Sequence, residues 1–225
     1  MGKNKLARFA ENKILENVIQ PTREEALDNF PLKGNWRKDI FRNDNPIVLE
    51  LGCGKGEYSV GLAKAIPEKN FIGIDIKGAR FWFGAKEASE NGISNVAFLR
   101  TQVELVDCFF EENEVDEIWI TFPDPQIKYR RTKHRMTHPD FLERYKKILK
   151  PNGIIHLKTD SEFLHGYTLG ILQGAGHEII TAHHDIYGAP EYDPNTELLR
   201  EIKTYYEELF SAKGKTITYI KFRIK

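Results

Sequence analysis

At 225 residues the chain is long enough for one large domain. Lys plus Arg and Asp plus Glu each number 33, so the formal net charge is zero and the protein as a whole does not attract a polyanion such as nucleic acid. Its two cysteines, Cys53 and Cys108, form no C-x-x-C pair, which excludes a cysteine-rich zinc site and gives no support for a disulfide framework. No apolar run approaches about 18 residues and the N-terminus lacks the apolar core of a signal peptide, so we expect a cytoplasmic protein without membrane contact.

The first 45 residues differ in character from the rest. Residues 1–20 carry Lys3, Lys5, Arg8 and Lys13 with few apolar positions, which is typical of a frayed basic tail or of an arm that orders on RNA. Residues 21–45 predict a short helix and a connection. We expect residues 1–45 to be an N-terminal basic arm with a helical lead-in, and residues 46–225 to be a single domain.

A glycine-rich turn follows the first predicted strand. Residues 47–51 form an apolar run typical of a strand buried on both faces, and residues 58–66 are compatible with a helix. Between them stand three glycines, Gly52, Gly54 and Gly56. Strand, glycine turn and helix form the nucleotide or nucleoside cradle of doubly wound α/β folds. The alternative is a turn that only lets the helix pack closely on its strand.

Two acidic residues restrict the ligand of this turn. Glu57 stands where a dinucleotide fingerprint has its third glycine, so a pyrophosphate would meet a carboxylate. Glu50, within the strand, favours a cationic ligand without phosphate. S-adenosylmethionine is the obvious candidate, and an NAD-dependent dehydrogenase is disfavoured.

The next two strands add polar residues at their ends. Residues 70–76 predict a strand with Asp75 near its end, where a carboxylate can accept hydrogen bonds from two ribose hydroxyls. The alternative is a solvated aspartate. Residues 96–99 predict a third strand, and Gln102 follows it where an adenine ring would lie. We expect helices over residues 78–91 and 102–110.

The fourth predicted strand, residues 116–122, leads into Pro123-Asp124-Pro125. Ligands of open α/β sheets bind outside the carboxyl ends of the strands, so this loop should share one cleft with the glycine turn. The prolines stiffen the backbone around Asp124, which suits a carboxylate that positions a reacting group. The alternative is a structural turn.

A basic run follows this loop. Residues 128–135 contain five Lys or Arg residues with Tyr129 and His134 among them. Cations interleaved with aromatic rings favour contact with RNA phosphates and bases, although such a run can also be a solvated face. The residues expected to contact RNA are Arg130, Arg131, Lys133, His134 and Arg135.

The remaining elements complete an alternating pattern. Residues 138–149 predict a helix, and residues 153–159 predict a fifth strand that ends at Asp160. Asp160 is either a second carboxylate of the cleft or the N-cap of the next helix. Further on we expect a strand over 177–182, a helix over 195–210 and an antiparallel strand over 215–222. His183, His184 and Asp185 have no evident third ligand partner, so no metal is expected.

These elements predict an α/β fold with a seven-stranded, mostly parallel sheet, an antiparallel last strand and helices on both faces. With its residues laid out, the chain resembles the bacterial tRNA (guanine-N7)-methyltransferases, which methylate guanine at position 46 in the variable loop of tRNA. The resemblance rests on Leu49-Glu50-Leu51-Gly52-x-Gly54-x-Gly56 and on Phe122-Pro123-Asp124-Pro125 with Lys128 and the basic run. It implies a Rossmann-like class I methyltransferase that uses S-adenosyl-L-methionine.

The resemblance also implies roles for single residues. It assigns Glu50, Gly52, Gly54, Gly56, Asp75, Gln102 and Asp124 to the cofactor, with Asp124 as the catalytic residue. It assigns Lys128, Asp160, Thr204, Tyr205, Tyr206 and Glu207 to the substrate, and the basic run to tRNA. The chain departs from the family at Gln126, where many members have Trp, and at Gln102, where many have Asp.

Guanine N7 carries an in-plane lone pair, so methyl transfer can be a direct in-line displacement with no proton to remove first. The protein must then supply alignment and tolerate positive charge on the purine. Three alternatives stay open: a methyltransferase acting on another RNA base, one acting on a small molecule, and a non-catalytic RNA-binding module. Pro123-Asp124-Pro125-Gln126 is unlike the Asn/Asp-Pro-Pro-Tyr/Phe motif of amino-group methyltransferases. Both a monomer and a homodimer are compatible with the sequence.

Overall fold

The computed structural model describes residues 2–188 and 195–225, and its centre is one twisted sheet. The spatial order of the eight strands in the described residues is β1-β4-β3-β2-β5-β6-β8-β7. Their bounds are β1 Val18–Ile19, β2 Ile47–Leu51, β3 Asn70–Ile74, β4 Val96–Leu99, β5 Val115–Thr121, β6 Leu149–Thr159, β7 Glu178–His183 and β8 Thr218–Arg223. Strand β8 runs antiparallel to both of its neighbours, β6 and β7, while β1 to β6 pair in parallel. The predicted fold class and the antiparallel last strand are confirmed.

The strand count is one higher than the seven predicted. Strand β1 has only two residues, which pair in parallel with Phe98 and Leu99 of β4. Two residues are too short to show the alternation by which strands are recognised. This strand lies at the edge of the sheet, where the carbonyls of Asn17 and Ile19 accept hydrogen bonds from the N–H groups of Phe98 and Arg100.

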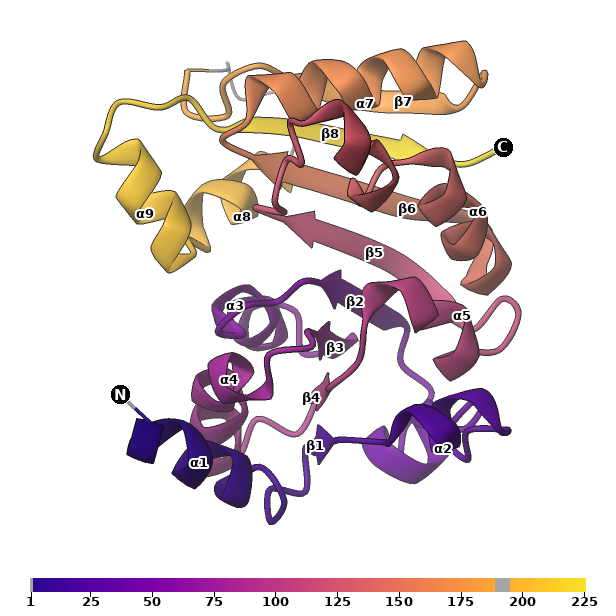
Figure 1. The fold of residues 1–225 in the computed structure, drawn as a ribbon, viewed down its shortest axis with the longest axis vertical. Helices are drawn as coiled ribbons and strands as arrows, with labels where there is room; N and C mark the ends of the chain where they lie inside the picture. The colour runs from indigo at the N-terminus through magenta and orange to yellow at the C-terminus, as the bar shows by residue number, and fades with distance from the viewer. Residues whose placement is uncertain (1, 189–194) are drawn as a thin grey trace.

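Helices cover both faces of the sheet (Figure 1). Their bounds are α1 Gly2–Glu11, α2 Arg23–Leu27, α3 Glu57–Ala65, α4 Gly78–Glu90, α5 Val106–Phe109, α6 Pro139–Ile148, α7 Glu162–Gly174, α8 Asn195–Glu201 and α9 Tyr205–Ser211. Side chains of successive strand residues point to opposite faces, so Leu49 and Leu51 join a core with α2, α5, α6 and α7, whereas Val48 joins a second core with α3 and α4. Glu50 shares the face of Val48.

Two predicted helices are divided. The helix expected over 102–110 is a 3-10 turn at Val103–Leu105 followed by α5. The helix expected over 195–210 is interrupted before α9, because the Thr204 side chain accepts a hydrogen bond from the backbone N–H of Glu207 (3.1 Å) and so acts as an N-cap.

The N-terminal segment is part of the folded body. Helix α1 packs on α4, and the Asn12 side chain donates a hydrogen bond to the carbonyl of Gly78 (2.9 Å). The Trp36 indole is fully buried and donates to the carbonyl of Phe109 (2.9 Å). Of the two alternatives for this basic segment, a frayed tail is therefore wrong for residues 2–11, and Met1 lies outside the described residues.

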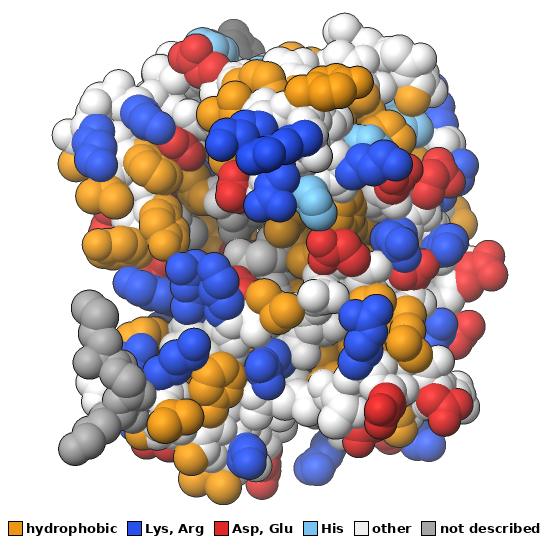
Figure 2. Space-filling model, in the orientation of Figure 1, with side chains coloured by type: hydrophobic (Ala, Val, Ile, Leu, Met, Phe, Trp, Pro, Cys, Tyr) orange, Lys and Arg blue, Asp and Glu red, His pale blue; other side chains and the backbone are white. Residues whose placement is uncertain are grey.

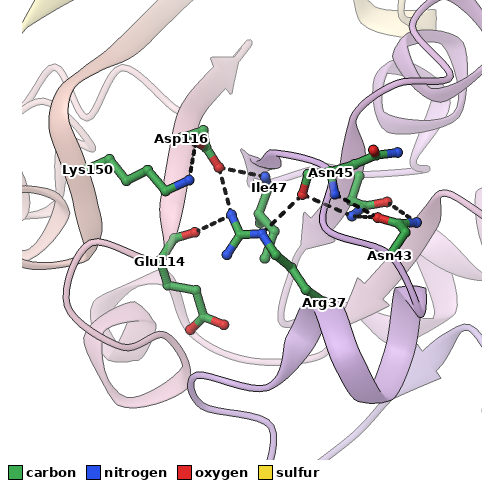
Figure 3. Close-up of polar contacts among 8 residues, drawn as sticks. Arg37, Asn43, Asn45, Ile47, Glu114, Asp116 and Lys150 are labelled. Atoms are coloured by element: carbon green, nitrogen blue, oxygen red, sulfur yellow. Dashed lines mark hydrogen bonds and ion pairs between the residues drawn. The ribbon is translucent and has the colours of Figure 1, made fainter.

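An ion-pair network ties the sheet together at the end opposite the carboxyl ends of the strands (Figure 3). Arg37, in the π-helical turn Trp36–Phe41, donates to the Asp116 carboxylate (2.8 Å) and to the carbonyl of Glu114 (3.0 Å). Asp116 also accepts from the N–H of Ile47 (2.8 Å) and from Lys150 (2.6 Å). The starts of β2, β5 and β6 are thus held by one carboxylate, which fixes the strands whose other ends carry the predicted site.

Candidate functional site

A cavity of about 550 Å³ opens at the carboxyl ends of the central parallel strands. It lies where the chain order changes direction, with β3 on one side of β2 and β5 on the other, which is the position expected for ligands of this fold class. Figure 2 shows a hollow near the centre of this face, with charged side chains at its rim. The predicted site residues that line the cavity are Glu50, Gly52, Gly54, Asp75, Asp124, Asp160, Thr204 and Tyr206.

The glycines of the turn have different roles. Gly54 has φ +58°, and a Cβ added there would meet no atom within 4 Å, so this backbone borders open space in the cavity. Gly56 has φ +79°, and a Cβ there would lie 2.5 Å from the Phe98 ring and 3.3 Å from the Cα of Gly84. Gly56 therefore allows close packing of the start of α3, and the prediction that it borders the cofactor is not matched by its position.

Glu50 is a buried carboxylate in the floor of the cavity, with 3% of its surface exposed. Its oxygens accept hydrogen bonds from the backbone N–H and hydroxyl of Ser59 and from the hydroxyl of Thr121 (2.5 Å). Burial raises the pKa of Glu50 to about 7, against the hydrogen bonds from Ser59 and Thr121, which lower it. A cation in the cavity would favour the ionised form, so the site is suited to a positively charged ligand.

Asp75 joins the end of β3 to the glycine turn. Its carboxylate accepts from the N–H of Gly54 (3.1 Å) and from the N–H of Lys77 (2.7 Å). These bonds fix the side chain at the cavity wall. Gln102 lies elsewhere: it is exposed and lines a smaller pocket of about 330 Å³ with Ile76, Arg100 and residues 21–23.

The Asp124 loop is held in an uncommon backbone conformation. Phe122 has φ +47° and Gln126 has φ +46°, a region that residues other than glycine seldom adopt. The Asp124 carboxylate accepts from the N–H of Gln126 (3.0 Å) and is exposed. It lines the main cavity and also a second pocket of about 720 Å³, whose wall includes Lys128 and much of the basic run.

Arg135 differs from the rest of the basic run. It is buried, and its guanidinium donates to the carbonyl of Gln126 (3.1 Å) and lies over the rings of Phe163 and Tyr167. The prediction that Arg135 contacts RNA is wrong, because the side chain braces the Asp124 loop from inside. Its four companions, Arg130, Arg131, Lys133 and His134, are not buried.

Asp160 is a cavity residue and not a helix cap. Ser161 is the N-cap of α7, since its hydroxyl accepts from the N–H of Leu164 (3.2 Å). One Asp160 oxygen accepts instead from the ammonium of Lys215 (2.6 Å), which also lines the cavity. The alternative that Asp160 caps α7 is therefore wrong.

Glu207 lies beneath the cavity wall and forms a buried ion pair. Its carboxylate accepts from Lys158 (2.7 Å) and from the Tyr187 hydroxyl (2.7 Å), and the side chains of both Lys158 and Glu207 are fully buried. The Lys158 ammonium also donates to the carbonyls of Leu199 (2.5 Å) and Ile202 (3.2 Å). Burial lowers the pKa of Lys158 to about 8, although Glu207 opposes that shift.

This pair revises one prediction and adds a residue that the sequence did not indicate. Glu207 does not line the cavity; it is buried in the ion pair with Lys158, in the first turn of α9. Lys158 in β6 anchors the end of α8 and the first turn of α9, and thereby positions Thr204 and Tyr206. The sequence did not indicate that Lys158 is buried, because the residues that pair with its ammonium lie 41 to 49 positions further along the chain.

Within residues 2–188 and 195–225, no group of three metal-binding side chains is placed to hold an ion, and no helix is long and apolar enough to cross a membrane. His183, His184 and Asp185 follow one another at the end of β7, and His184 lies 3.7 Å from the Glu162 carboxylate.

The fold, the glycine turn and the acidic strand ends together define a class I methyltransferase. The family described as "Putative methyltransferase" matches residues 44–220. A tRNA (guanine-N(7)-)-methyltransferase of Christiangramia forsetii is 66% identical over 225 residues, covering 100% of this chain and 99% of that protein. One from Bacteroides fragilis is 51% identical over 224 residues, covering 99% and 86%.

The chain belongs to the family of tRNA (guanine-N7)-methyltransferases, so the predicted family is confirmed. Members of this family use S-adenosyl-L-methionine as methyl donor. The fold is also similar to a solved structure titled "Structure of an Antibiotic Related Methyltransferase", with a TM-score of 0.61, 18% identity and coverage of 88% of this chain and 96% of that chain.

Proposed function

We propose that this protein transfers a methyl group from S-adenosyl-L-methionine to N7 of a guanine in tRNA, at position 46 of the variable loop, and that Asp124 is its catalytic residue. The main support is the place of Asp124. Its loop lies between the cavity and a pocket lined by Lys128, Arg130, Arg131 and His134, so one carboxylate borders both sites. A cofactor in the first and RNA on the second would meet there.

The residues of the cavity fit the cofactor. Gly54 leaves space for a ligand against the backbone, Asp75 offers a fixed carboxylate to a ribose, and Glu50 offers negative charge to a cationic group. When bound, S-adenosyl-L-methionine supplies a methyl group on a positively charged sulfur. We assign Glu50, Gly52, Gly54 and Asp75 to its binding, and leave Gln102 to the adjoining pocket.

Asp124 acts on the base. Its carboxylate accepts hydrogen bonds from the N–H edge of the guanine and stabilises the positive charge that develops on the ring during methylation. The two positive-φ residues beside it and the Arg135 brace limit movement of the loop, which favours alignment of N7 with the methyl group. No general base is required, because the N7 lone pair is already free.

The remaining assignments follow from position. Lys128, Arg130, Arg131 and His134, which line the second pocket, bind tRNA phosphates together with Lys133 of the same basic run, and Asp160, Thr204 and Tyr206 form the substrate side of the cavity. We further propose that residues 46–225 are the catalytic domain, that residues 1–45 complete its core through β1 and Trp36, and that the protein works in the cytoplasm, where its substrate is made.

The test is methyl transfer from labelled S-adenosyl-L-methionine to unmodified total tRNA, with the product nucleoside identified by mass spectrometry. We expect 7-methylguanosine, lost in Asp124→Asn with cofactor affinity kept. Asp160→Asn is the matched control, since the same change is made at the second carboxylate of the cavity. Near-normal turnover in Asp124→Asn with none in Asp160→Asn would transfer the catalytic role to Asp160. Label in another base would overturn the proposed substrate atom.

A further inference from the structure

A row of alternating cationic and aromatic side chains borders the cavity, apart from the basic run. It starts on α1, where the Arg8 guanidinium lies 4.4 Å from the centre of the Phe83 ring on α4. The Lys55 ammonium, in the glycine turn, lies 5.9 Å from the Phe83 ring and 3.9 Å from the Tyr205 ring on α9. Lys55 therefore bridges two aromatic rings that belong to different helices.

The row continues along α9 to the cavity. The ring centres of Tyr205 and Tyr206 lie 5.6 Å apart, and those of Tyr206 and Phe210 lie 6.2 Å apart. The Lys215 ammonium lies 4.6 Å from the Phe210 ring. We name this row the cation–aromatic arc; its members are Arg8, Phe83, Lys55, Tyr205, Tyr206, Phe210 and Lys215. Lys55, Tyr206, Phe210 and Lys215 line the cavity together with the Asp124 loop, whereas Arg8, Phe83 and Tyr205 extend the row beyond it.

Packing of the core does not account for these rings. Phe83 is 41% exposed, Tyr205 49% and Tyr206 41%, although aromatic side chains gain most when buried. In Figure 2, hydrophobic and basic side chains alternate to the left of the central hollow, over the region of α4 and α9. The exposed parts of these rings, with cations beside them, are available to a partner that brings rings of its own.

The charges of the arc favour an anionic partner. Among the described residues, Arg8 has ring contacts but no ion pair, and Lys55 has only a distant carboxylate, Glu57 at 3.7 Å. Lys215 is paired with Asp160. The net charge of the whole chain is zero, so the three cations gathered along this row are a local feature.

We propose that the cation–aromatic arc is a second RNA-binding surface, which stacks unpaired nucleotides next to the target guanine while its cations contact their phosphates. This inference rests on the proposed function. Base-on-aromatic stacking beside Lys and Arg is the usual way in which single-stranded nucleic acid is bound. A base presented to the cavity must leave its own stack, and its neighbours then need new stacking partners. The arc provides them at the cavity mouth.

Phe83 gives the sharpest test, because it does not line the cavity and is not among the residues assigned to catalysis or to the cofactor. Phe83→Leu keeps apolar bulk but removes the ring face, whereas Phe83→Tyr keeps the face. We expect Phe83→Leu to raise the Kd for tRNA and the KM for tRNA about tenfold, with kcat and the Kd for S-adenosyl-L-methionine unchanged. Phe83→Tyr should restore wild-type values.

A charge variant gives an independent measure. Arg8→Gln should weaken tRNA binding and lower the slope of log affinity against log salt by about one, since one phosphate contact is lost. Lys5→Gln removes the same charge from the same helix outside the arc, and should have a smaller effect. Equal effects of Arg8→Gln and Lys5→Gln would contradict the inference.

The inference is overturned if Phe83→Leu binds tRNA as the wild type does, or if it weakens S-adenosyl-L-methionine binding instead, which would make the arc a wall of the cofactor site. Failure of the proposed function would give a different result, because the wild-type protein would then form no 7-methylguanosine. The tRNA Kd of the variants would still decide whether the arc binds RNA.

Discussion

Replacing Glu50 by Gln tests whether the buried carboxylate lowers the stability of the protein while strengthening the binding of a cationic ligand. Glu50 is buried, and its two oxygens accept hydrogen bonds from Ser59 and Thr121. In Glu50→Gln the carbonyl oxygen can still accept from the Ser59 N–H, and the amide can donate to the Thr121 hydroxyl, which also accepts. The substitution therefore removes the charge while retaining a set of hydrogen bonds.

The magnitude follows from the pKa of this carboxyl, which burial raises from its ordinary value of 4.5 to about 7. Between these two pH values the folded protein holds a proton that the unfolded chain has lost. The free energy of unfolding of the wild type must then fall as the pH rises through this window, by about 3 kcal/mol from this group alone. Above about pH 7 the whole cost is present; below pH 4.5 it is absent.

The assay is urea unfolding of the wild type and Glu50→Gln at a series of pH values across this window. All other titrating groups are shared, so the difference between the two proteins isolates Glu50. We expect the variant to gain stability relative to the wild type as the pH rises, by up to about 3 kcal/mol. Calorimetry should show weaker binding of S-adenosyl-L-methionine, because the negative charge is gone. Parallel pH profiles of the two proteins would refute the reasoning.

Two further predictions concern the framework of the site. Gly56→Ala should lower the free energy of unfolding by about 3 kcal/mol, because the new Cβ overlaps the Phe98 ring at a position with positive φ. Gly54→Ala should lower it by only about 1 kcal/mol and should mainly weaken cofactor binding. Equal losses of stability in urea unfolding would contradict this difference. Lys158→Ala should lower the free energy of unfolding by about 3–5 kcal/mol, because it leaves the Glu207 carboxylate buried without its partner. The double variant with Glu207→Leu should recover part of that stability. A loss under about 1 kcal/mol for Lys158→Ala, measured by urea unfolding, would refute the pairing.

The central strands and the position of the cavity could be predicted from the sequence because their signals are local. Apolar runs between glycine and proline marked the central strands, and the parallel arrangement of alternating strands and helices brings their carboxyl ends to one edge. Glu50, Asp75 and Asp124 were therefore expected in one cleft, with Asp160 either a further carboxylate there or a helix cap, and all four line the cavity. The antiparallel β8 was also predicted correctly.

For other charged residues, only the tertiary structure decided whether they face that cavity or are buried. Arg135 lies within a basic run and Glu207 within a motif assigned to substrate, yet both are buried. The sequence shows the charge of a side chain but not its solvent exposure, so this burial could not be predicted. Lys158 and Glu207 stand 49 residues apart, and Arg8, Phe83 and Lys55 come from three separate segments. Such contacts arise only when distant elements pack, so the residues that hold the cavity wall and the arc along its rim were determined by the fold as a whole.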